Sequence, residues 1–394
     1  MEPNLLDPEL IADPRGGYGR MREVAPVQLG RMFDGSPTWY VTGAAEVRTV
    51  LGDPRFVNSV LSLPATVDRG SMPLVPGVEK DLSNPTILDT DGADHTRLRK
   101  LVSRAFTAQR MADMRPRIAA IAGELLDGLD PTRPVELLDS FAYPLPITVI
   151  CELVGVPEDD RPAWRAYSRD LVSMDPERIQ KGSAAMTAHV HDLAGRRRAE
   201  PADDLLTVLV QAHDDGDRLT ERELTTMVVA LVFAGHETTA NLIANSVVAL
   251  LGRPEQLDRL RRDPGAWPGA VHELMRLWSP AQFVQMRYAT EDLELGGRRI
   301  RAGESLLPIL VAANSDPREH PDPERFDVTR GPGHLGFGHG PHYCLGAALA
   351  RQEAEVALAA LFERFPALAL TGEPEWAPIP GMLRLTELPV QLGA

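Results

Sequence analysis

One segment restricts the fold of this chain more than any other, because it predicts a single helix of unusual length. Thr220 and Glu223 form the pattern of a capping box at its start, and Gly252 and Pro254 end the helical pattern after Leu251. At 1.5 Å per residue, a helix over these residues is about 46 Å long. A helix of that length must cross a whole domain, so the rest of the chain is predicted to pack around it.

The same helix is apolar in its middle and then turns abruptly polar. Residues 227–233 are all apolar, and Gly235-His236-Glu237-Thr238-Thr239 follow two positions later. Glycine lowers helix stability and a mid-helix threonine can bond backward to the helix carbonyls, so we expect a local distortion here. A carboxylate in an apolar helix is costly unless it is satisfied or used. Glu237 is therefore a candidate for chemistry, and the alternative is a glutamate that only bonds a nearby side chain.

Composition excludes several classes of protein. The chain has 394 residues, 43% of them hydrophobic and 25% charged, which is ordinary for a globular protein. No linker, low-complexity tract or repeat divides it, so residues 1–394 are predicted to form one domain. The formal net charge of -15 argues against nucleic acid or an anionic membrane as partner, because both would repel an acidic surface. We expect a soluble monomer.

The cysteines and the apolar runs indicate the cellular compartment of the protein. Cys151 and Cys344 are the only cysteines, too few for a disulfide framework, which indicates a reducing compartment. We see no signal peptide, and the apolar run 227–235 is shorter than the roughly 20 residues that span a bilayer. We therefore expect a cytoplasmic protein. Cys151 lies in an apolar stretch and is interpreted as a small buried hydrophobe.

Helix is predicted for most of the chain, with a few extended segments. Residues 39–42 have the pattern of a short strand, and residues 45–52 that of a helix. Extended residues are predicted over 283–310, with Gly296-Gly297 as a turn, and a further helix over 345–365. The fold class is therefore mainly α.

A helix predicted from His95 to Ala105 carries two distinct polar faces. Leu98, Leu101, Val102 and Ala105 form its apolar face. His95 and Arg99 share a second face because they are four residues apart. A third face carries basic residues and is expected to point outward: Arg97, Lys100 and Arg104.

A glycine-rich loop precedes the last long helix and reads Phe337-Gly338-His339-Gly340-Pro341-His342-Tyr343-Cys344-Leu345-Gly346. It places a thiol just before a helix N-terminus, where the helix dipole and free N–H groups are expected to lower the thiol pKa. Gly338, Gly340 and Gly346 permit tight turns and close approach of a flat ligand. This context favours a thiolate at Cys344.

This loop resembles the heme-binding motif Phe-Gly-x-Gly-x-His-x-Cys-x-Gly of the cytochrome P450 superfamily. Four further segments resemble motifs of that family in its order. They are the oxygen-activation motif in Ala234–Thr239, the Glu-x-x-Arg motif in Glu273–Arg276, the segment that locks it in Pro323–Phe326, and the heme-propionate helix in Asp91–Arg99. The resemblance covers nearly the whole chain.

The resemblance implies roles for single residues. Cys344 is expected to be the axial thiolate ligand of the iron of heme b, and four residues are expected to hold the heme propionates: His95, Arg99, Arg287 and His342. Glu237 and Thr238 match the acid and alcohol that deliver protons to bound dioxygen.

A structural ion network is also implied. It is expected to join Glu273 and Arg276 to Arg325, with Arg330 as the competing third member.

The implied fold is the triangular, mainly α-helical prism of this family with a small β-rich region. The implied reaction inserts one oxygen atom from dioxygen into a bulky apolar small molecule, with electrons from NAD(P)H through a reductase and a ferredoxin. The overall pattern is similar to bacterial enzymes that hydroxylate or epoxidise macrolides and other polyketides. Three alternatives remain: a peroxide-driven peroxygenase, an oxidative coupling or ring-forming enzyme of the same family, and a non-catalytic heme protein.

The same resemblance implies a substrate pocket lined by mostly apolar segments: the loop before His95, Ala230, Leu231, Ala234, Phe283, Val284 and Ile379–Met382. An apolar pocket orients a bulky carbon skeleton without specifying it, so these residues leave the substrate open.

Overall fold

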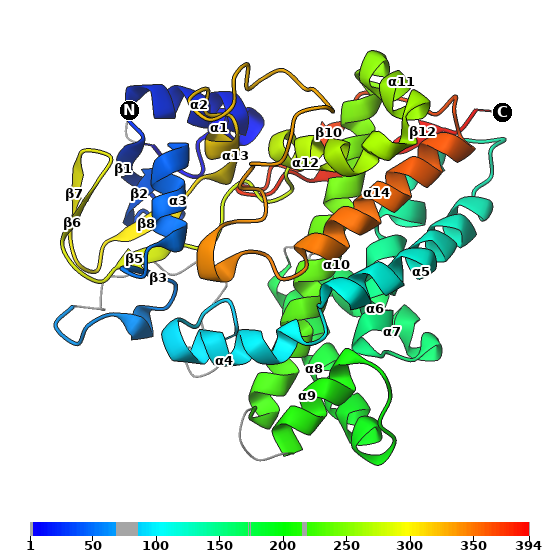
Figure 1. Cartoon of the computed structure of the whole chain (residues 1–394), viewed down its shortest axis with the longest axis horizontal. Helices are drawn as coiled ribbons and strands as arrows, with labels where there is room; N and C mark the ends of the chain where they lie inside the picture. The colour runs from blue at the N-terminus through cyan, green and yellow to red at the C-terminus, as the bar shows by residue number, and fades with distance from the viewer. Residues whose placement is uncertain (1–2, 68–85, 172, 174, 215–218, 394) are drawn as a thin grey trace.

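The predicted long helix is the central element of the computed structural model, which describes residues 3–67, 86–171, 173, 175–214 and 219–393. This helix, α10 (Glu221–Leu251), runs through the middle of the molecule (Figure 1). Thr220 and Glu223 form the predicted capping box at its start. The backward bond expected near Thr238 is present, since its hydroxyl donates to the Ala234 carbonyl at 2.6 Å, and the segment remains helical throughout.

Helices make up most of the described chain. In order they are α1 (Pro8–Ala12), α2 (Pro14–Val24), α3 (Ala44–Gly52), α4 (Gly92–Ser103), α5 (Ala108–Asp127), α6 (Pro144–Val154), α7 (Arg161–Leu171), α8 (Pro176–Ala199), α9 (Leu205–Asp214), α10, α11 (Pro254–Arg262), α12 (Trp267–Leu277), α13 (Leu310–Asn314) and α14 (Ala347–Arg364). The predicted helices over 45–52, 95–105 and 345–365 correspond to α3, α4 and α14, with ends that differ by at most three residues.

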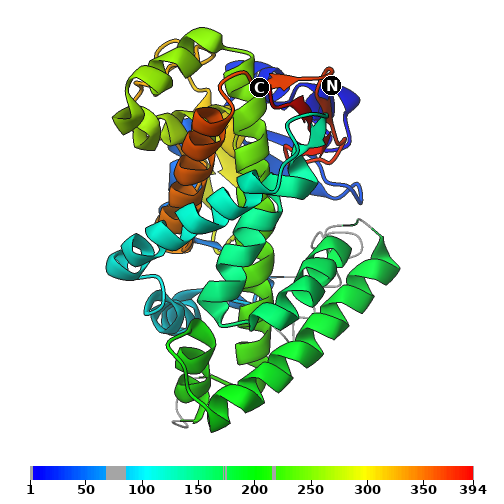
Figure 2. The same ribbon diagram turned by 90° about the vertical axis from the view of Figure 1, so that its right-hand side faces the viewer.

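The largest hydrophobic cluster surrounds α10. It combines side chains of α5, α6, α10, α12 and α14, and α10 itself packs against α6, α8 and α14. Figure 2 shows α7 and α8 side by side at the narrow end of the molecule, where they contact each other closely. The outline in Figure 1 tapers from the broad end that carries the strands to this helical end.

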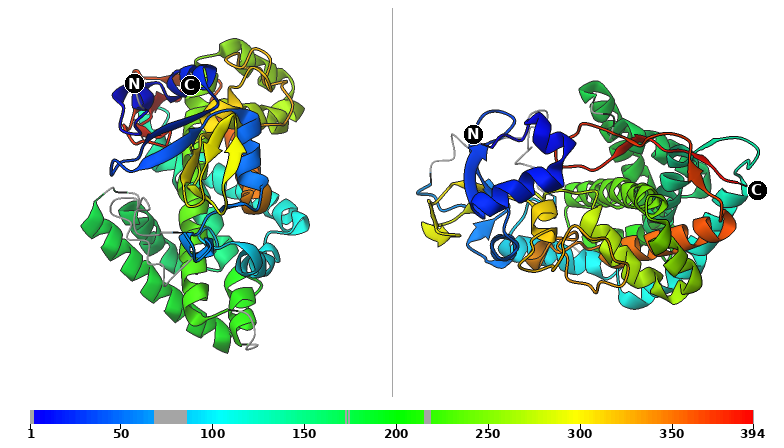
Figure 3. Two further views of the ribbon diagram at one scale, coloured as in Figure 1. Left: turned by 90° about the vertical axis from the view of Figure 1, so that its left-hand side faces the viewer. Right: turned by 90° about the horizontal axis from the view of Figure 1, so that it is seen from above.

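The strands lie beside the helical part. One sheet has the order β1-β2-β8-β5-β3, and only the β2–β8 pair in it is parallel. Figure 3 looks onto this side, where strands from the N-terminal segment lie beside strands from residues 287–308. The bounds of all strands are β1 (Val27–Arg31), β2 (Pro37–Val41), β3 (Phe56–Val57), β4 (Val135–Glu136), β5 (Arg287–Ala289), β6 (Leu293–Leu295), β7 (Arg298–Ile300), β8 (Ser305–Pro308), β9 (Ala369–Leu370), β10 (Glu375–Trp376), β11 (Leu385–Glu387) and β12 (Pro389–Gln391).

The central helix is also long and apolar enough to qualify as a membrane span by length and composition, with a mean hydropathy of 1.4 over its best window. Within the structure, however, 61% of that window is buried. Its C-terminal half also buries Asn241, Asn245 and Ser246 against other parts of the protein. The apolar character of α10 is therefore that of a core helix.

Candidate active site

The glycine-rich loop folds back on itself before α14. Gly338 and Gly340 have φ of 72° and 71°, a conformation that favours glycine, and a Cβ at Gly340 would collide with the backbone at the end of α3. The Cys344 amide donates to the Phe337 carbonyl at 2.9 Å and closes the loop. Gly346, with an ordinary φ of -84°, is the N-cap residue of α14. The loop thus holds Cys344 two residues before the N-cap.

The Cys344 side chain is accessible, although protein atoms surround much of it. Desolvation raises the pKa of its thiol, and the Gly346 N–H and the Arg99 charge oppose this rise. The lowering expected from the helix N-terminus is present in the Gly346 N–H, but desolvation outweighs it in the chain alone. A coordinated metal ion deprotonates a thiol outright, so a thiolate here depends on the metal.

The helix α4 places His95 beside this loop. The Asp91 carboxylate accepts hydrogen bonds from the backbone amides of Asn58 and Ser59, which fixes the start of α4. The His95 ring lies 4.0 Å from the ring of His342, centroid to centroid. His95 is 4% exposed, and burial together with the charges of His342 and Arg99 lowers its pKa to about 4. Its Nε2 atom is buried without a partner among the described residues.

Two arginines complete this cluster. Arg99 extends from α4 and donates to the Tyr343 carbonyl at 2.6 Å, next to Cys344. Arg287 begins β5, is 4% exposed, and donates to the carbonyl of Gln285 at 2.8 Å. Burial lowers the pKa of Arg287 to about 10, and no carboxylate of the described residues lies within ion-pairing distance of it.

The residues present fit a heme. A buried guanidinium without a carboxylate and a buried imidazole nitrogen without a partner both require an anionic or hydrogen-bonding group nearby. The two propionates of a heme supply such groups, and an accessible thiol beside them supplies the ligand for its iron. His95, Arg99, His342 and Cys344 are brought together by α4 and the loop before α14, and Arg287 of β5 is close enough to feel the charge of Asp91, which lies 3.9 Å from His342.

On α10, the Glu237 side chain is 1% exposed and lies in a polar network. Its Oε1 atom accepts from Asn241 at 2.9 Å and from the Tyr143 hydroxyl at 3.4 Å, and it lies 3.4 Å from an Arg384 nitrogen. Its Oε2 atom is buried without a partner among the described residues. Burial raises the pKa of Glu237, and the Arg384 charge and the two hydrogen bonds offset part of this rise.

Sequence reasoning missed the three partners of Glu237. Asn241 follows it by four residues on the same helix, so helical spacing contained that signal. Tyr143 precedes α6 and Arg384 precedes β11, and no local pattern connects either one to Glu237.

The middle of α10 leaves apolar surface accessible next to this network. Phe233 is 43% exposed although the helix on both sides of it is largely buried. The predicted pocket-lining segments around Phe283 and around Ile379–Met382 also meet, since the backbone N–H of Gln282 donates to the Gly381 carbonyl at 2.9 Å. Part of the loop before His95, residues 68–85, lies outside the described residues.

The predicted ion network exists, but with a different third member. Arg276 contacts both carboxylate oxygens of Glu273, at 2.7 and 2.8 Å, and both residues are almost fully buried. Arg330 completes the network at 3.2 Å from Glu273, whereas the Arg325 side chain is 67% exposed and faces Asp327. The first choice, Arg325, is therefore wrong. Arg325 contributes only its backbone carbonyl, because the chain at 321–330 turns its side chain outward.

The basic face of α4 is also smaller than predicted. Arg97 forms an ion pair with Glu223 at the start of α10, 2.5 Å away, so its positive charge is compensated within the protein. Lys100 and Arg104 are exposed, and neither is ion-paired within the described part of the chain.

Comparisons with known proteins agree with this arrangement. The family model described as "Cytochrome P450" matches residues 152–264 and 268–393. Cytochrome P450 107B1 of Saccharopolyspora erythraea is 44% identical over 401 residues, which cover 100% of this chain and 98% of that protein. The 6-deoxyerythronolide B hydroxylase of the same organism is 44% identical over 376 residues, 93% of this chain and 92% of that protein.

Solved structures agree in fold as well as in sequence. The ligand-free P450 monooxygenase TamI has a TM-score of 0.88 and 40% identity, covering 100% of this chain and 94% of that one. The family match covers α10 and the Cys344 loop, and the relatives and the shared fold also cover α4. The chain therefore belongs to the cytochrome P450 family and is a monooxygenase of that family.

Proposed function

We propose that this protein uses heme b to hydroxylate or epoxidise a bulky, apolar, polyketide- or macrolide-like molecule. The observation that carries the proposal is the accessible Cys344 thiol near Arg99 and His95, together with a buried His95 nitrogen and a buried Arg287 that lack anionic partners among the described residues. The apolar surface at Phe233 supports a large apolar substrate. The similarity to a hydroxylase of 6-deoxyerythronolide B supports the chemical class.

Each residue of the site has a defined task in this proposal. When bound, the heme would supply dioxygen activation, and the Cys344 thiolate would hold its iron. His95, Arg99, Arg287 and His342 would hold the propionates through charge-assisted hydrogen bonds.

In this proposal Thr238 binds water and Glu237 transfers protons, on the side of α10 that faces the substrate. Thr238 donates to the Ala234 carbonyl, so its oxygen keeps lone pairs that accept a hydrogen bond from water. Burial raises the pKa of Glu237, and its unpartnered Oε2 is the atom free to take up a proton and pass it on.

The electron donor in this proposal is an acidic ferredoxin, itself reduced by a NAD(P)H-dependent reductase in the cytoplasm. Lys100 and Arg104 provide an exposed positive surface on α4, the helix that also carries His95 and Arg99. Charge complementarity of this kind accelerates and orients encounter even when the net charges of both proteins are negative.

Two measurements test the proposal. The reduced holoenzyme with carbon monoxide should show the long-wavelength Soret band of thiolate ligation, and Cys344→His should abolish it. The matched control is Cys151→Ser, which removes the other, buried thiol and should leave the band in place. A band that survives Cys344→His contradicts the assignment.

The substrate class is tested by screening macrolactones and small aromatic compounds for a Soret shift. Compounds that shift the band are then incubated with ferredoxin, reductase and NAD(P)H, and the product is analysed by mass spectrometry. We expect macrolactones to gain one oxygen atom. Turnover confined to small aromatic compounds, or loss of hydrogen without gain of oxygen, would contradict the proposed class and reaction.

A further inference from the structure

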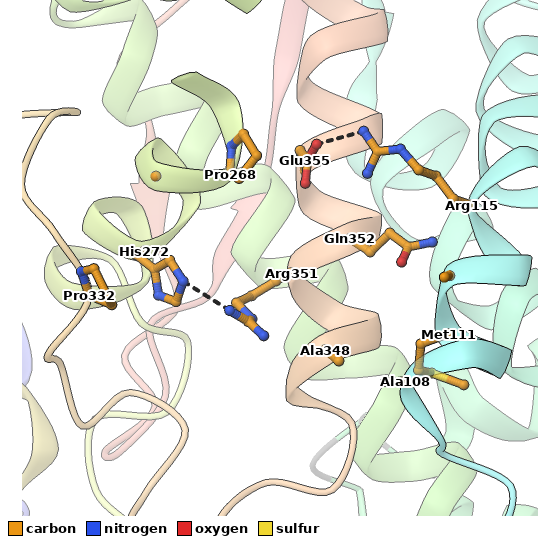
Figure 4. A pocket seen from close by; sticks show the side chains of 12 residues that line it. Ala108, Met111, Arg115, Pro268, His272, Pro332, Ala348, Arg351, Gln352 and Glu355 are labelled. Atoms are coloured by element: carbon orange, nitrogen blue, oxygen red, sulfur yellow. Dashed lines mark hydrogen bonds and ion pairs between the residues drawn. The ribbon is translucent and has the colours of Figure 1, made fainter. Parts of the chain in front are cut away.

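A pocket of about 430 Å³ opens on another part of the molecule, between α5, α12 and α14. None of its 12 lining residues belongs to the candidate active site. Helix α14 contributes Ala348, Arg351, Gln352 and Glu355, whose spacing places them on one helix face. Figure 4 shows these side chains opposite Met111 and Arg115 of α5 and His272 of α12.

The pocket contains more hydrogen-bond donors than acceptors. The Arg351 guanidinium donates to the Ala347 carbonyl at 3.1 Å and faces the His272 ring at 2.9 Å, but no carboxylate of the described chain pairs with it. The Gln352 amide nitrogen is buried without a partner among the described residues. The Glu355 carboxylate is already neutralised by Arg115 at 2.6 Å. One positive charge therefore remains uncompensated in the pocket.

His272, which lies next to Arg351, does not supply the missing hydrogen-bond acceptor. The Gly336 amide donates to Nδ1 of His334 at 3.1 Å, so a neutral His334 carries its proton on Nε2. That proton points to Nδ1 of His272 at 3.0 Å, which leaves the His272 proton on Nε2, facing the Arg351 guanidinium. Two N–H donors then face each other, on His272 and on Arg351. In this hydrogen-bonded series, which runs from Gly336 through the two histidines to Arg351, one N–H donor therefore lacks an acceptor.

Neither imidazole escapes this conflict by changing its charge. Burial and the neighbouring charges lower the pKa of His334 to about 3, and burial together with Arg351 lowers the pKa of His272. Both rings are therefore neutral near pH 7. Adding a proton would only add another donor, so the missing element is an acceptor.

We propose that this pocket binds the carboxylate of a short organic acid. One carboxylate accepts hydrogen bonds from Arg351 and His272 together and compensates the remaining charge. Met111, Pro268 and Pro332 offer apolar surface for the body of the acid.

The test uses the holoenzyme with clotrimazole on the heme iron, so that the substrate cavity is filled and binding there does not interfere. Butyrate is titrated at constant ionic strength with chloride, and butyramide serves as the neutral molecule of the same shape. Binding is measured by isothermal titration calorimetry and by the shift of Tm. We expect butyrate to bind and to raise Tm, and butyramide to do neither.

Variants locate the site. Arg351→Gln removes a charge-assisted hydrogen bond and should raise the Kd of butyrate by about tenfold or more. Arg364→Gln on the same helix removes an arginine that pairs with Asp127 outside the pocket, and should leave the Kd unchanged. His272→Phe keeps the Arg351 charge and should raise the Kd severalfold, which serves as the second test if Arg351→Gln does not fold.

Three results would overturn the inference: equal binding of butyrate and butyramide, no binding of butyrate, and an unchanged Kd in both pocket variants. Because the experiment needs no turnover, its outcome is independent of the substrate proposed for the enzyme.

Discussion

At the scale of single residues, the two oxygens of the Glu237 carboxyl group differ. Oε1 is held by Asn241, Tyr143 and Arg384, whereas Oε2 is buried without a partner in the described chain. Leaving a buried polar atom unpaired costs free energy, so such an atom in a native site indicates use. The neighbouring Thr238 hydroxyl is fixed by its bond to the Ala234 carbonyl. The pair is thus oriented before any substrate arrives.

This orientation predicts a specific effect of Thr238→Ala. The variant should bind heme and substrate nearly normally and still consume NAD(P)H, because electron supply does not involve the hydroxyl. Much of the consumption should yield hydrogen peroxide in place of product, since the proton is no longer guided. Peroxide and product are measured against NAD(P)H consumed, for at least two substrates because a substrate hydroxyl can replace the threonine.

The control for this experiment is Thr226→Ala, which removes a hydroxyl bonded to a carbonyl four residues earlier on the same helix, at 2.9 Å. It should leave coupling unchanged. Full coupling in Thr238→Ala with every substrate tried would refute the role proposed for Thr238. Glu237→Gln should instead slow overall turnover by roughly 100-fold, as expected when a positioned proton donor is lost.

At the scale of elements, α12 is tied to the segment before the Cys344 loop by charge. Arg276 also donates to the carbonyls of Asn314 and Pro323, each at 2.8 Å, so one guanidinium joins α12, α13 and the segment at 321–330. A buried ion pair is worth little compared with an apolar contact, but breaking one strands a charge. The network therefore fixes the relative positions of these elements.

The prediction for this network is a loss of stability. Glu273→Ala should lower the free energy of unfolding by about 3–5 kcal/mol, because Arg276 and Arg330 lose their buried carboxylate. Arg330→Ala should destabilise the protein more than Arg325→Ala, whose side chain is exposed. Urea unfolding and heme content report the effect, and a heme-replete, stable Glu273→Ala protein would contradict it.

Helix α4 is the second element with a testable role. Lys100→Glu combined with Arg104→Glu should slow the first electron transfer from an acidic ferredoxin by about tenfold at low salt, and should reduce its salt dependence. Substrate affinity should not change. The matched charge reversal Lys181→Glu on α8 serves as control, and stopped-flow reduction is the measurement. Unchanged reduction rates in the double variant would place the docking surface elsewhere.

At the scale of the whole molecule, buried histidines couple stability to pH. Burial and nearby arginines lower the pKa of His236 to about 4, and His334 has a pKa of about 3 for similar reasons. An unfolded histidine titrates near 6.5. Between these values the unfolded chain binds more protons than the native protein, so stability falls as pH falls below about 6.5.

Each such histidine should contribute a slope of up to about 1.4 kcal/mol per pH unit in the free energy of unfolding. The contribution is complete above pH 7 and is lost as pH falls toward 4 for His236. Urea unfolding of wild type and His236→Gln between pH 4.5 and 7 tests this, and the variant should show the smaller slope. Parallel curves for the two proteins would disprove the assignment.

The sequence by itself determined the elements and the motifs. The capping box at Thr220 and the loop around Cys344 depend on residues a few positions apart and occur where predicted, and the strand predicted over 39–42 lies at 37–41. The apolar face of α4 also occurs as predicted, because helical spacing alone fixes which residues share a face.

Only the tertiary structure decided how side chains from distant segments pair. It placed Arg330 in the Glu273 network in preference to Arg325, joined Arg97 to Glu223, and surrounded Glu237 with partners from two other segments. It also set the sign of the Cys344 thiol pKa shift, since desolvation depends on every atom packed nearby. The spacing of residues determines which side chains share a face of one helix or strand. Which side chains pair, and which are buried, depends on how other elements pack against that face.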